Sequence, residues 1–364
     1  MYFKIKKNIK TFEPKSYVKE EPCSSLNSLI DCSLGVNPFG HSDKINSSLE
    51  KINLSSYPDF PYSELKNEII KYWNCSHIAH SNIRFGGGSI DILRNINKAF
   101  IEKNTKVLGC APTFTSYPSD VLLNEGIFDY VPLSENTNYK FDAEKFISLI
   151  NDKYSLIYID NPNNPTGQII PLDEIRQIAE KARENNVCLF VDEAYGDFMD
   201  EKNSAINLTD SFENIMVSRT FSKGFGLAGL RIGYLIAGNY LTETISKVDI
   251  PFTINSLGTF AAIEALKDKS FILESRTNIG KIKKALMNSF KNLKVLETNL
   301  EVPIMTLTTL DPKIHLYKLF YINGVLTESG EDFNGLQKNF IRMRVPKDPT
   351  ELMNRINSVE KQLA

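Results

Sequence analysis

Long hydrophobic runs, paired cysteines and an excess of charge are all missing from this sequence of 364 residues. No run approaches the ~20 apolar residues that a membrane helix needs, and the basic N-terminus lacks the apolar core of a signal peptide. The five cysteines form no Cys-x-x-Cys pair, which argues against a disulfide framework and against a zinc site. A net charge of −2 favours neither nucleic acid nor an anionic membrane as a partner. We therefore expect a soluble protein of the reducing cytoplasm.

Apolar runs that end in polar residues predict the core of the fold. Strands are expected at 82–85, 106–110, 156–160, 187–192, 214–218 and 231–237. Helices are expected at 63–73 (with Ser63 as a possible cap), 89–102 and 172–183. Strands that are apolar almost throughout are buried on both faces, as in a parallel sheet covered by helices. The pattern therefore predicts an α/β fold.

The order of the expected helices and strands changes after about residue 250. Helical patterns at 257–267, 271–293 and 351–362 surround strand patterns at 301–307 and 340–345. We expect three parts: an irregular N-terminal arm at 1–50 that contributes to the small domain and a dimer, a large domain at 51–250, and a small α+β domain at 251–364.

A single lysine, Lys223, stands among small and hydroxyl-bearing residues in the segment 218–233. A lysine is a useful nucleophile toward an aldehyde only when its charged form is disfavoured or replaced by an imine. Thr220, Ser222 and Arg231 have the side chains to hold a phosphate. Alone, such a lysine is most often solvated, but lysine, aldehyde and phosphate together suggest pyridoxal 5′-phosphate (PLP).

Three further motifs follow expected strands. Gly86 to Gly88 precede a helix, where backbone amides can bind an anion, although a plain tight turn is an equal alternative. The segment 160–167 is rich in turn formers but lies where open α/β sheets place ligand groups. Asp192 ends a buried strand, and its carboxylate needs a partner, which is either a protonated pyridine nitrogen or a structural salt bridge.

The order and spacing of these motifs resemble the fold-type I aminotransferase family. The resemblance is carried by Asn-Asn-Pro-Thr-Gly at 163–167, Asp-Glu-Ala-Tyr at 192–195 and Ser-Lys…Gly-Leu-Arg at 222–231, and it extends from 33–38 through 57–59 to 340–342. It points to the branch that contains histidinol-phosphate aminotransferase and threonine-phosphate decarboxylase. It implies a large domain with a mostly parallel seven-stranded sheet between helices, a smaller α+β domain, PLP as cofactor, and a homodimer with shared active sites.

The resemblance also implies a role for each matching residue near the cofactor. Lys223 would form an aldimine with PLP and move the substrate α-proton, while Asp192 would pair with the ring nitrogen. Tyr195 and Asn164 would hydrogen-bond the ring oxygen O3′, and Phe114 would stack on the ring. The phosphate would be held by Gly88, Ser89, Ile90, Thr220, Ser222 and Arg231, and by Tyr57 from the other subunit.

The substrate, by the same resemblance, would contact Gly35, Asn37, Asn164, Arg342 and Glu328. Arg342 would bind the substrate carboxylate, and Arg344, two residues along the same expected strand, would have a structural role. Glu328 stands where relatives have an arginine that helps bind an anionic group. This change of sign puts a phosphorylated substrate in doubt. Glu328, with Glu331 or Asp332, is either a determinant that favours a neutral or cationic amino donor or a solvated loop carboxylate.

Several reactions are compatible with this site, because the cofactor itself supplies the carbanion chemistry. Transamination between an amino acid or similar amine and a 2-oxo acid is the expected reaction. α-Decarboxylation is the alternative, and oxidation, cyclisation or elimination come after it. A non-catalytic PLP sensor is disfavoured, because residues 1–50 are too short and unhelical for a DNA-binding segment.

Overall fold

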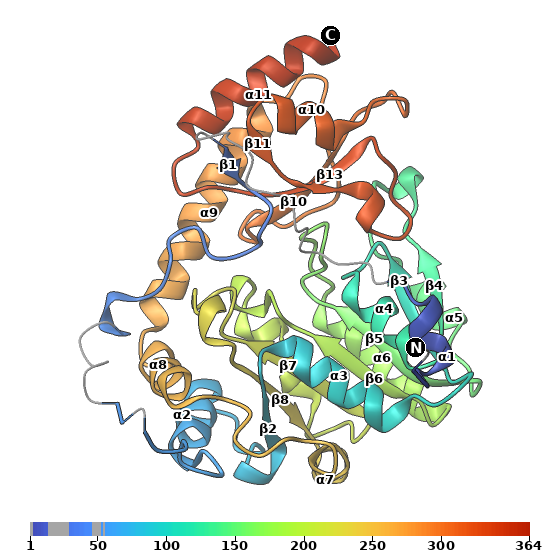
Figure 1. Cartoon of the computed structure of the whole chain (residues 1–364), viewed down its shortest axis with the longest axis vertical. Coiled ribbons are helices and arrows are strands. Elements are labelled where there is room, and N and C mark those ends of the chain that lie inside the picture. The colour runs from blue at the N-terminus through green and yellow to red at the C-terminus, as the bar shows by residue number, and fades with distance from the viewer. Residues whose placement is uncertain (1–2, 14–28, 46–51, 54) are drawn as a thin grey trace.

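A seven-stranded sheet forms the centre of the larger part of the molecule in the computed structural model, which describes residues 3–13, 29–45, 52–53 and 55–364 (Figure 1). Its strands, in spatial order, are β2 (Ile83–Gly86), β8 (Gly233–Ala237), β7 (Ile215–Thr220), β6 (Cys188–Asp192), β5 (Tyr154–Asp160), β3 (Lys106–Ala111) and β4 (Ile127–Pro132). The ladders from β7 to β4 are parallel, whereas β8 runs antiparallel to both of its neighbours. The predicted α/β fold with a mostly parallel seven-stranded sheet is confirmed.

Both faces of this sheet are covered, which explains why its central strands are apolar almost throughout. Leu156 and Tyr158 of β5 pack with helices on one face, while Ile157 and Ile159 pack with helices on the other. The first face carries α3 (Ser89–Phe100), α4 (Ser116–Leu123) and α7 (Asn239–Ser246). The second carries α2 (Ser63–Trp73), α5 (Ala143–Ser148), α6 (Leu172–Glu184) and α8 (Ser256–Leu266).

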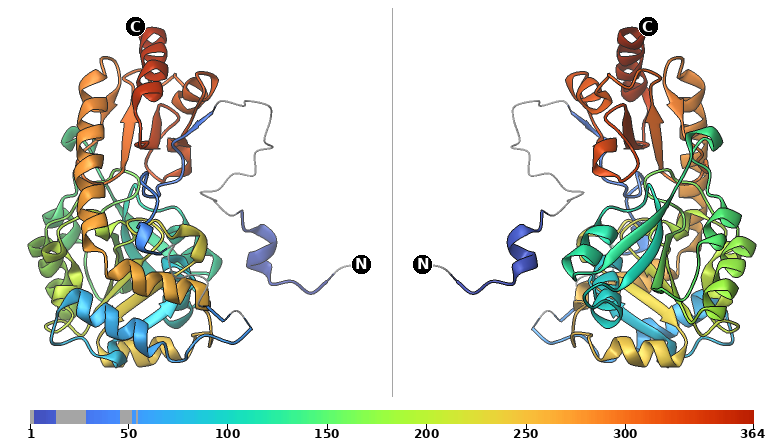
Figure 2. Two further views of the ribbon diagram at one scale, coloured as in Figure 1. Left: turned by 90° about the vertical axis from the view of Figure 1, so that its left-hand side faces the viewer. Right: turned by 90° about the vertical axis from the view of Figure 1, so that its right-hand side faces the viewer.

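A smaller antiparallel sheet lies at the other end of the molecule (Figure 1). Its spatial order is β12 (Glu328–Ser329), β13 (Phe340–Arg344), β10 (Ile304–Thr308) and β9 (Lys294–Val295). Three helices share its apolar core, namely α9 (Lys269–Ser289), α10 (Leu316–Ile322) and α11 (Thr350–Leu363). Figure 2 shows α9 running alongside both parts of the molecule.

The segment 29–45 joins this smaller part from the far end of the chain. Its strand β1 (Ile30–Asp31) pairs in parallel with β11 (Val325–Leu326). A short helix, α1 (Lys7–Thr11), lies earlier in the arm that we predicted to be irregular, so that prediction is wrong at this point. Residues 1–2, 14–28 and 46–50 of the predicted arm lie outside the described residues.

Short 3-10 turns complete the described elements: η2 (His80–Asn82), η3 (Glu135–Thr137), η4 (Gly196–Phe198), η5 (Glu201–Asn203), η6 (Ala205–Leu208), η7 (Ala228–Leu230) and η8 (Gly330–Asp332). Ser63 is not a cap but the first residue of α2, whose cap position is taken by Tyr62 in a left-handed conformation. The domain boundaries at residues 50 and 250 stay a prediction.

Two features of the described ranges bear on the class of protein. None of their helices is long and apolar enough to span a membrane, and none of their His, Cys, Asp and Glu side chains gather in threes as metal ligands would. Their cysteines (Cys32, Cys75, Cys110 and Cys188) are free thiols, while Cys23 lies outside these ranges.

Candidate active site

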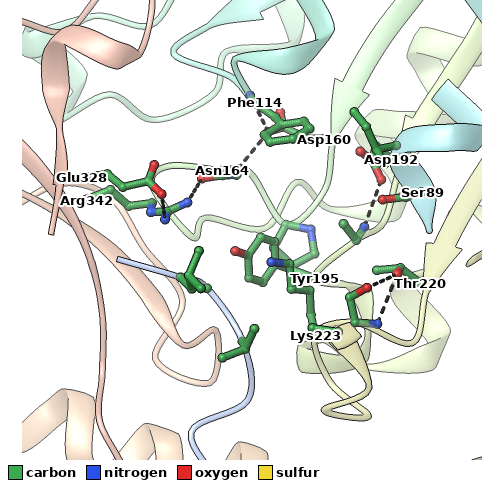
Figure 3. Close-up of a pocket in the computed structure, with 18 of the residues that line it drawn as sticks. Ser89, Phe114, Asp160, Asn164, Asp192, Tyr195, Thr220, Lys223, Glu328 and Arg342 are labelled. Atoms are coloured by element: carbon green, nitrogen blue, oxygen red, sulfur yellow. Dashed lines mark hydrogen bonds and ion pairs between the residues drawn. The ribbon is translucent and has the colours of Figure 1, made fainter. Parts of the chain in front are cut away.

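A cavity of about 950 Å³, open to solvent, lies where the carboxyl ends of the large-sheet strands face the smaller sheet (Figure 3). It is lined by Leu34, Gly35, Val36, Ser89, Ile90, Phe114, Asp160, Pro162, Asn164, Asp192, Ala194, Tyr195, Thr220, Ser222, Lys223, Ala228, Arg231, Glu328 and Arg342. Its lining combines apolar walls with a few polar and charged groups, which is typical of sites that bind small molecules. The structure thus brings together most of the site residues expected from the sequence, from regions of the chain up to about 300 residues apart.

Lys223 projects from the turn that follows β7 and ends in the cavity. Burial, together with the nearby positive charge of Arg342, lowers the pKa of Lys223 from its ordinary value to about 8. Its Nζ lies 5.5 Å from the centre of the Tyr195 ring. A lysine with a depressed pKa is more often neutral and is therefore a better nucleophile toward an aldehyde.

Asp192 ends β6 at the base of the cavity and is almost fully buried. It accepts hydrogen bonds from neutral donors: Ser218 Oγ at 2.8 Å, Ala194 N at 3.1 Å and Tyr158 Oη at 3.5 Å. Burial, together with the nearby charge of Asp160, raises the pKa of Asp192 to about 7, and Asp192 forms no ion pair with a cation of the described residues. A protonated pyridine nitrogen would supply the missing positive charge, so this end of the cavity fits PLP.

Close to Asp192, on the same side of the cavity, lies an anion cradle (Figure 3). Helix α3 begins there at Ser89, and its first-turn amides carry partial positive charge. The Thr220 hydroxyl donates to Ser222 Oγ at 2.9 Å, and Arg231 Nη1 donates to the same oxygen at 3.3 Å. Hydroxyls, a helix start and a guanidinium in one place suit a phosphate group.

Gly88 is required in this cradle for two reasons. Its φ of +88° is in the left-handed region, and a Cβ at this position would lie 2.6 Å from Arg231 Nη2. Arg231 Nη2 itself donates to the carbonyl of Gly87 at 3.1 Å. The glycine run therefore lets the guanidinium approach the backbone at the start of α3.

Asp160, at the end of β5, holds the two loops that carry Asn164 and Phe114. Its carboxylate accepts from the backbone amides of Asn164 at 2.8 Å and Phe114 at 3.3 Å, and from Thr113 Oγ1 at 2.9 Å. Sequence reasoning placed Asp160 in a ligand-binding segment but gave it no role of its own. Its position at the end of a buried strand, one strand from Asp192, was the available signal.

The substrate end of the cavity is formed by Arg342 on β13 and Glu328 on β12, two residues whose side chains are at most 7% exposed. Arg342 Nη2 lies 2.6 Å from Glu328 Oε1, and Arg342 Nη1 donates to Asn164 Oδ1 at 3.0 Å. Arg342 Nη2 also contacts the carbonyl of Ser33. The alternative that Glu328 is a solvated loop carboxylate is therefore wrong. Glu331, by contrast, is exposed and pairs with His315 at 3.3 Å, away from the cavity.

Three other predicted residues lie elsewhere. Tyr57 is 79% exposed on the outer surface and does not line this cavity, so its role toward a second subunit stays a prediction. Asn37 lies just behind the cavity wall, where its amide donates to the carbonyl of Gly224, the residue after Lys223, at 2.8 Å. Arg344 binds the carbonyl of Asp31 at 2.5 Å and does not line the cavity.

A second buried arginine lies beneath the lysine turn. Arg219 of β7 binds Glu193 Oε2 at 2.8 Å and Asp197 Oδ1 at 2.5 Å. Glu193 also accepts from Ser204 Oγ at 2.6 Å and from the amide of Ala205 at 2.7 Å. All three charged side chains of this cluster are at most 3% exposed, and none of them lines the cavity.

Comparisons with known proteins agree with this geometry. The family model described as aminotransferase class I and II matches residues 33–356. A histidinol-phosphate aminotransferase from Caldicellulosiruptor saccharolyticus is 31% identical over 326 residues, which are 88% of either chain. The crystal structure of the histidinol-phosphate aminotransferase from Clostridium acetobutylicum has a TM-score of 0.83 at 24% identity, covering 92% of this chain and all of that one. The corresponding enzyme from Sinorhizobium meliloti, solved in complex with pyridoxal 5′-phosphate, has a TM-score of 0.79 at 21% identity, covering 93% of this chain and 92% of that one.

Proposed function

We propose how the residues of this site work from the premise that the chain belongs to the class I and II aminotransferase family. The protein is a PLP-dependent aminotransferase that moves an amino group from an amino donor to a 2-oxo acid. The observation that carries the assignment of roles is the convergence of Lys223, Asp192 and the anion cradle on one cavity. The relatives are named as aminotransferases, which favours transamination over the decarboxylation that the sequence left as an alternative.

When bound, PLP supplies an electron-withdrawing ring that stabilises negative charge at the substrate carbon bearing the amine. Lys223 is placed to hold the cofactor by its aldehyde carbon, and its depressed pKa lets Nζ accept and return a proton near neutral pH. Asp192 holds the proton on the ring nitrogen, because its carboxylate is buried among neutral donors. Tyr195, whose pKa burial raises to about 12, stays a hydrogen-bond donor toward the ring oxygen.

The remaining residues fix the position of both ligands. Ser89, Ile90, Thr220, Ser222 and Arg231 hold the cofactor phosphate, with Gly88 giving the backbone the required conformation. Phe114 covers the ring from the loop that Asp160 anchors. Arg342 and Asn164 orient the substrate, and Gly35 keeps the wall next to Tyr195 thin, since a Cβ there would overlap the Tyr195 hydroxyl.

We also propose that two copies of the chain form a homodimer in which Tyr57 reaches the phosphate of the partner's cofactor. The rings of Tyr57 and Phe252 pack on the surface with their centres 4.7 Å apart and their planes tilted by 31°, and the ring centre of Phe60 lies 5.4 Å from that of Phe252. These rings are 79%, 42% and 56% exposed, and such a group of exposed aromatic side chains is typical of an interface. Replacement of Tyr57 by Phe should weaken PLP affinity by one charge-assisted hydrogen bond, about tenfold or more. A monomeric active protein would contradict this role. A cytoplasmic location stays a prediction.

The role of Lys223 is tested with Lys223→Ala and, as the matched control, Lys247→Ala at an exposed position. Borohydride reduction fixes the cofactor on the lysine that holds it, and peptide mass spectrometry then locates that lysine. We expect the label on Lys223 in the parent and in Lys247→Ala, and no label in Lys223→Ala. Label on another lysine in the parent would refute the assignment. A panel of amino donors with 2-oxoglutarate and pyruvate, followed by mass spectrometry, identifies the products.

A further inference from the structure

An ion pair between two neighbouring strands occupies the substrate end of the cavity. Glu328 and Arg342 are register partners on the antiparallel strands β12 and β13, so their side chains leave the sheet side by side. Figure 3 shows the two groups meeting at the cavity wall, with Asn164 on the other side of the guanidinium. An anion that approaches Arg342 therefore meets a guanidinium that already binds a carboxylate.

The hydrogen bonds of Arg342 show what an incoming anion can gain. The guanidinium of Arg342 has five N–H groups on three nitrogens. Nη1 donates to Asn164 Oδ1, while Nη2 donates to the carbonyl of Ser33 and pairs with Glu328. Nε is buried, and no acceptor among the described residues takes its hydrogen. A carboxylate that enters can bind Nε and one Nη nitrogen in the paired geometry that guanidinium favours, provided that Glu328 gives way on the Nη2 side.

Glu328 therefore disfavours anionic ligands beside Arg342 but not uncharged or cationic ligands. Two carboxylates, or a carboxylate and a phosphate, beside one guanidinium repel each other, and like charges at this distance discriminate strongly against a ligand. An uncharged or cationic group at the same place meets no such penalty, because the pair of Glu328 and Arg342 stays intact.

An aminotransferase binds two substrates in turn in this one cavity. The 2-oxo acid always brings a carboxylate, whereas the amino donor does not have to. If both substrates brought an anion to Arg342, Glu328 would oppose both halves of the reaction. Its presence in the wall is useful when one of the two substrates has no anion at that place.

We propose, resting on the aminotransferase function given above, that Glu328 determines specificity by masking Arg342. The amino donor is a primary amine that is neutral or cationic and has no carboxylate or phosphate at this end, such as an amino alcohol or a diamine. The 2-oxo acid then displaces Glu328 from Arg342 in the other half of the reaction. The exchange balances without another reactant: the amine carbon of the donor becomes a carbonyl carbon, and the carbonyl carbon of the 2-oxo acid becomes the amine carbon of an amino acid.

Binding of unreactive carboxylates tests the masking directly. Lactate and 2-hydroxyglutarate, the analogues of pyruvate and 2-oxoglutarate, are titrated into the holoenzyme by calorimetry. Glu328→Gln removes the competing charge and should lower their Kd about tenfold or more. The matched control is Glu331→Gln, the same change three residues away at an exposed position outside the cavity, which should leave Kd unchanged. An unchanged Kd in Glu328→Gln overturns the proposal.

The donor class is tested by kinetics with either 2-oxo acid. We expect the parent to have a higher kcat/KM for histidinol and for putrescine than for histidinol phosphate. Glu328→Gln should raise kcat/KM for histidinol phosphate about tenfold relative to histidinol and should lower KM for the 2-oxo acid, with little change in kcat. A parent enzyme that prefers histidinol phosphate, or that accepts only α-amino acids as donors, overturns the proposal.

Failure of this proposal and failure of the proposed function have different signatures. If no label appears on Lys223 and no donor yields an amino acid, the function itself is refuted. A labelled, active enzyme with unchanged carboxylate affinity in Glu328→Gln refutes the masking alone. If circular dichroism shows that Glu328→Gln does not fold, Glu328→Asp replaces it in the test. This variant keeps the negative charge but holds it farther from Arg342, so the Kd of the variant for lactate and 2-hydroxyglutarate should fall, by less than tenfold. No decrease in Kd in that variant also overturns the proposal.

Discussion

Two buried arginines of this protein each bind carboxylates, yet their surroundings differ. Arg219 lies between Glu193 and Asp197 beneath the lysine turn, where neighbouring hydroxyl and amide groups satisfy the carboxylate oxygens of Glu193. Arg342 meets Glu328 at the wall of the cavity and keeps a buried Nε without an acceptor in the described part of the chain. The first arginine is enclosed by protein, whereas the second faces space that a ligand can enter.

Burial alone therefore does not reveal the role of an ion pair, since both of these pairs are buried. Removing one member of an enclosed cluster leaves a charge in a medium of low dielectric with nothing to replace its partner. A pair that borders a cavity can exchange its partner for a ligand. We therefore expect Arg219 to serve stability and Arg342 to serve recognition.

The largest expected effect is the loss of stability in Arg219→Met. Glu193 and Asp197 would stay buried without their cation, which should lower the free energy of unfolding by about 3–5 kcal/mol. Urea unfolding of the holoenzyme measures this change. A loss below about 1 kcal/mol would show that the enclosed cluster does not stabilise the fold. Arg219 and Arg342 would then no longer differ in the way proposed here.

Another buried carboxylate, Asp192, extends the comparison because no arginine of the described residues forms an ion pair with it. Its folded-state pKa is raised to about 7 from an ordinary value of 3.8, so the folded apoprotein binds a proton more tightly than the unfolded chain does. The stability of the apoprotein should therefore fall as pH rises from about 4 to about 7, by at most roughly 4 kcal/mol. Asp192→Asn should flatten this dependence, although Asp160, whose burial raises its pKa to about 6, keeps part of it. A profile in Asp192→Asn as steep as that of the parent would contradict the assignment.

Arg342→Met should act mainly on recognition. Loss of the guanidinium should raise KM for the 2-oxo acid about 100-fold, which corresponds to about 2.7 kcal/mol, while stability falls less than in Arg219→Met. Arg344→Met is the matched control, because Arg344 lies two residues along the same strand and binds the carbonyl of Asp31 outside the cavity. If both variants raise KM equally, the effect belongs to the strand and not to Arg342.

The smallest expected effect is that of salt. Chloride can reach Arg342 through the open cavity but cannot reach the enclosed Arg219, so 0.5 M chloride should raise KM for the 2-oxo acid about two- to threefold. The midpoint of urea unfolding should change little over the same range. Acetate in place of chloride extends the test, since a carboxylate should compete more effectively at equal ionic strength.

The cofactor end of the site could be predicted from the sequence because its residues stand at the ends of continuous apolar runs. Asp160 and Asp192 are the last residues of β5 and β6, whose residues are mostly buried on both faces, and Lys223 follows β7. In such a sheet the carboxyl ends of parallel strands meet at one edge, so local patterns already imply that these side chains are neighbours.

The substrate end could not be predicted in this way. Strand β12 contains only Glu328 and Ser329, too few residues for any periodic signal, and its register with β13 depends on contacts remote in sequence. Strand β4 also went unpredicted, because it is an edge strand whose side chains are mostly at least partly exposed and so form no apolar run. The glutamate was noticed as a departure from relatives, but only the fold places it on the arginine.

The contacts of the segment 29–45 determine when the active site can be completed during synthesis of the chain. The carbonyl of Ser33 contacts Arg342, 309 residues later in the chain, and Asn37 holds the carbonyl of Gly224, 187 residues later. During synthesis from the N-terminus, this early segment leaves the ribosome long before its partners exist. The large sheet can form while translation continues. The contact of Ser33 with Arg342, by contrast, can form only after β13 has been synthesised. The substrate end of the site is thus completed late, after β13, the last strand of the described residues, has been released.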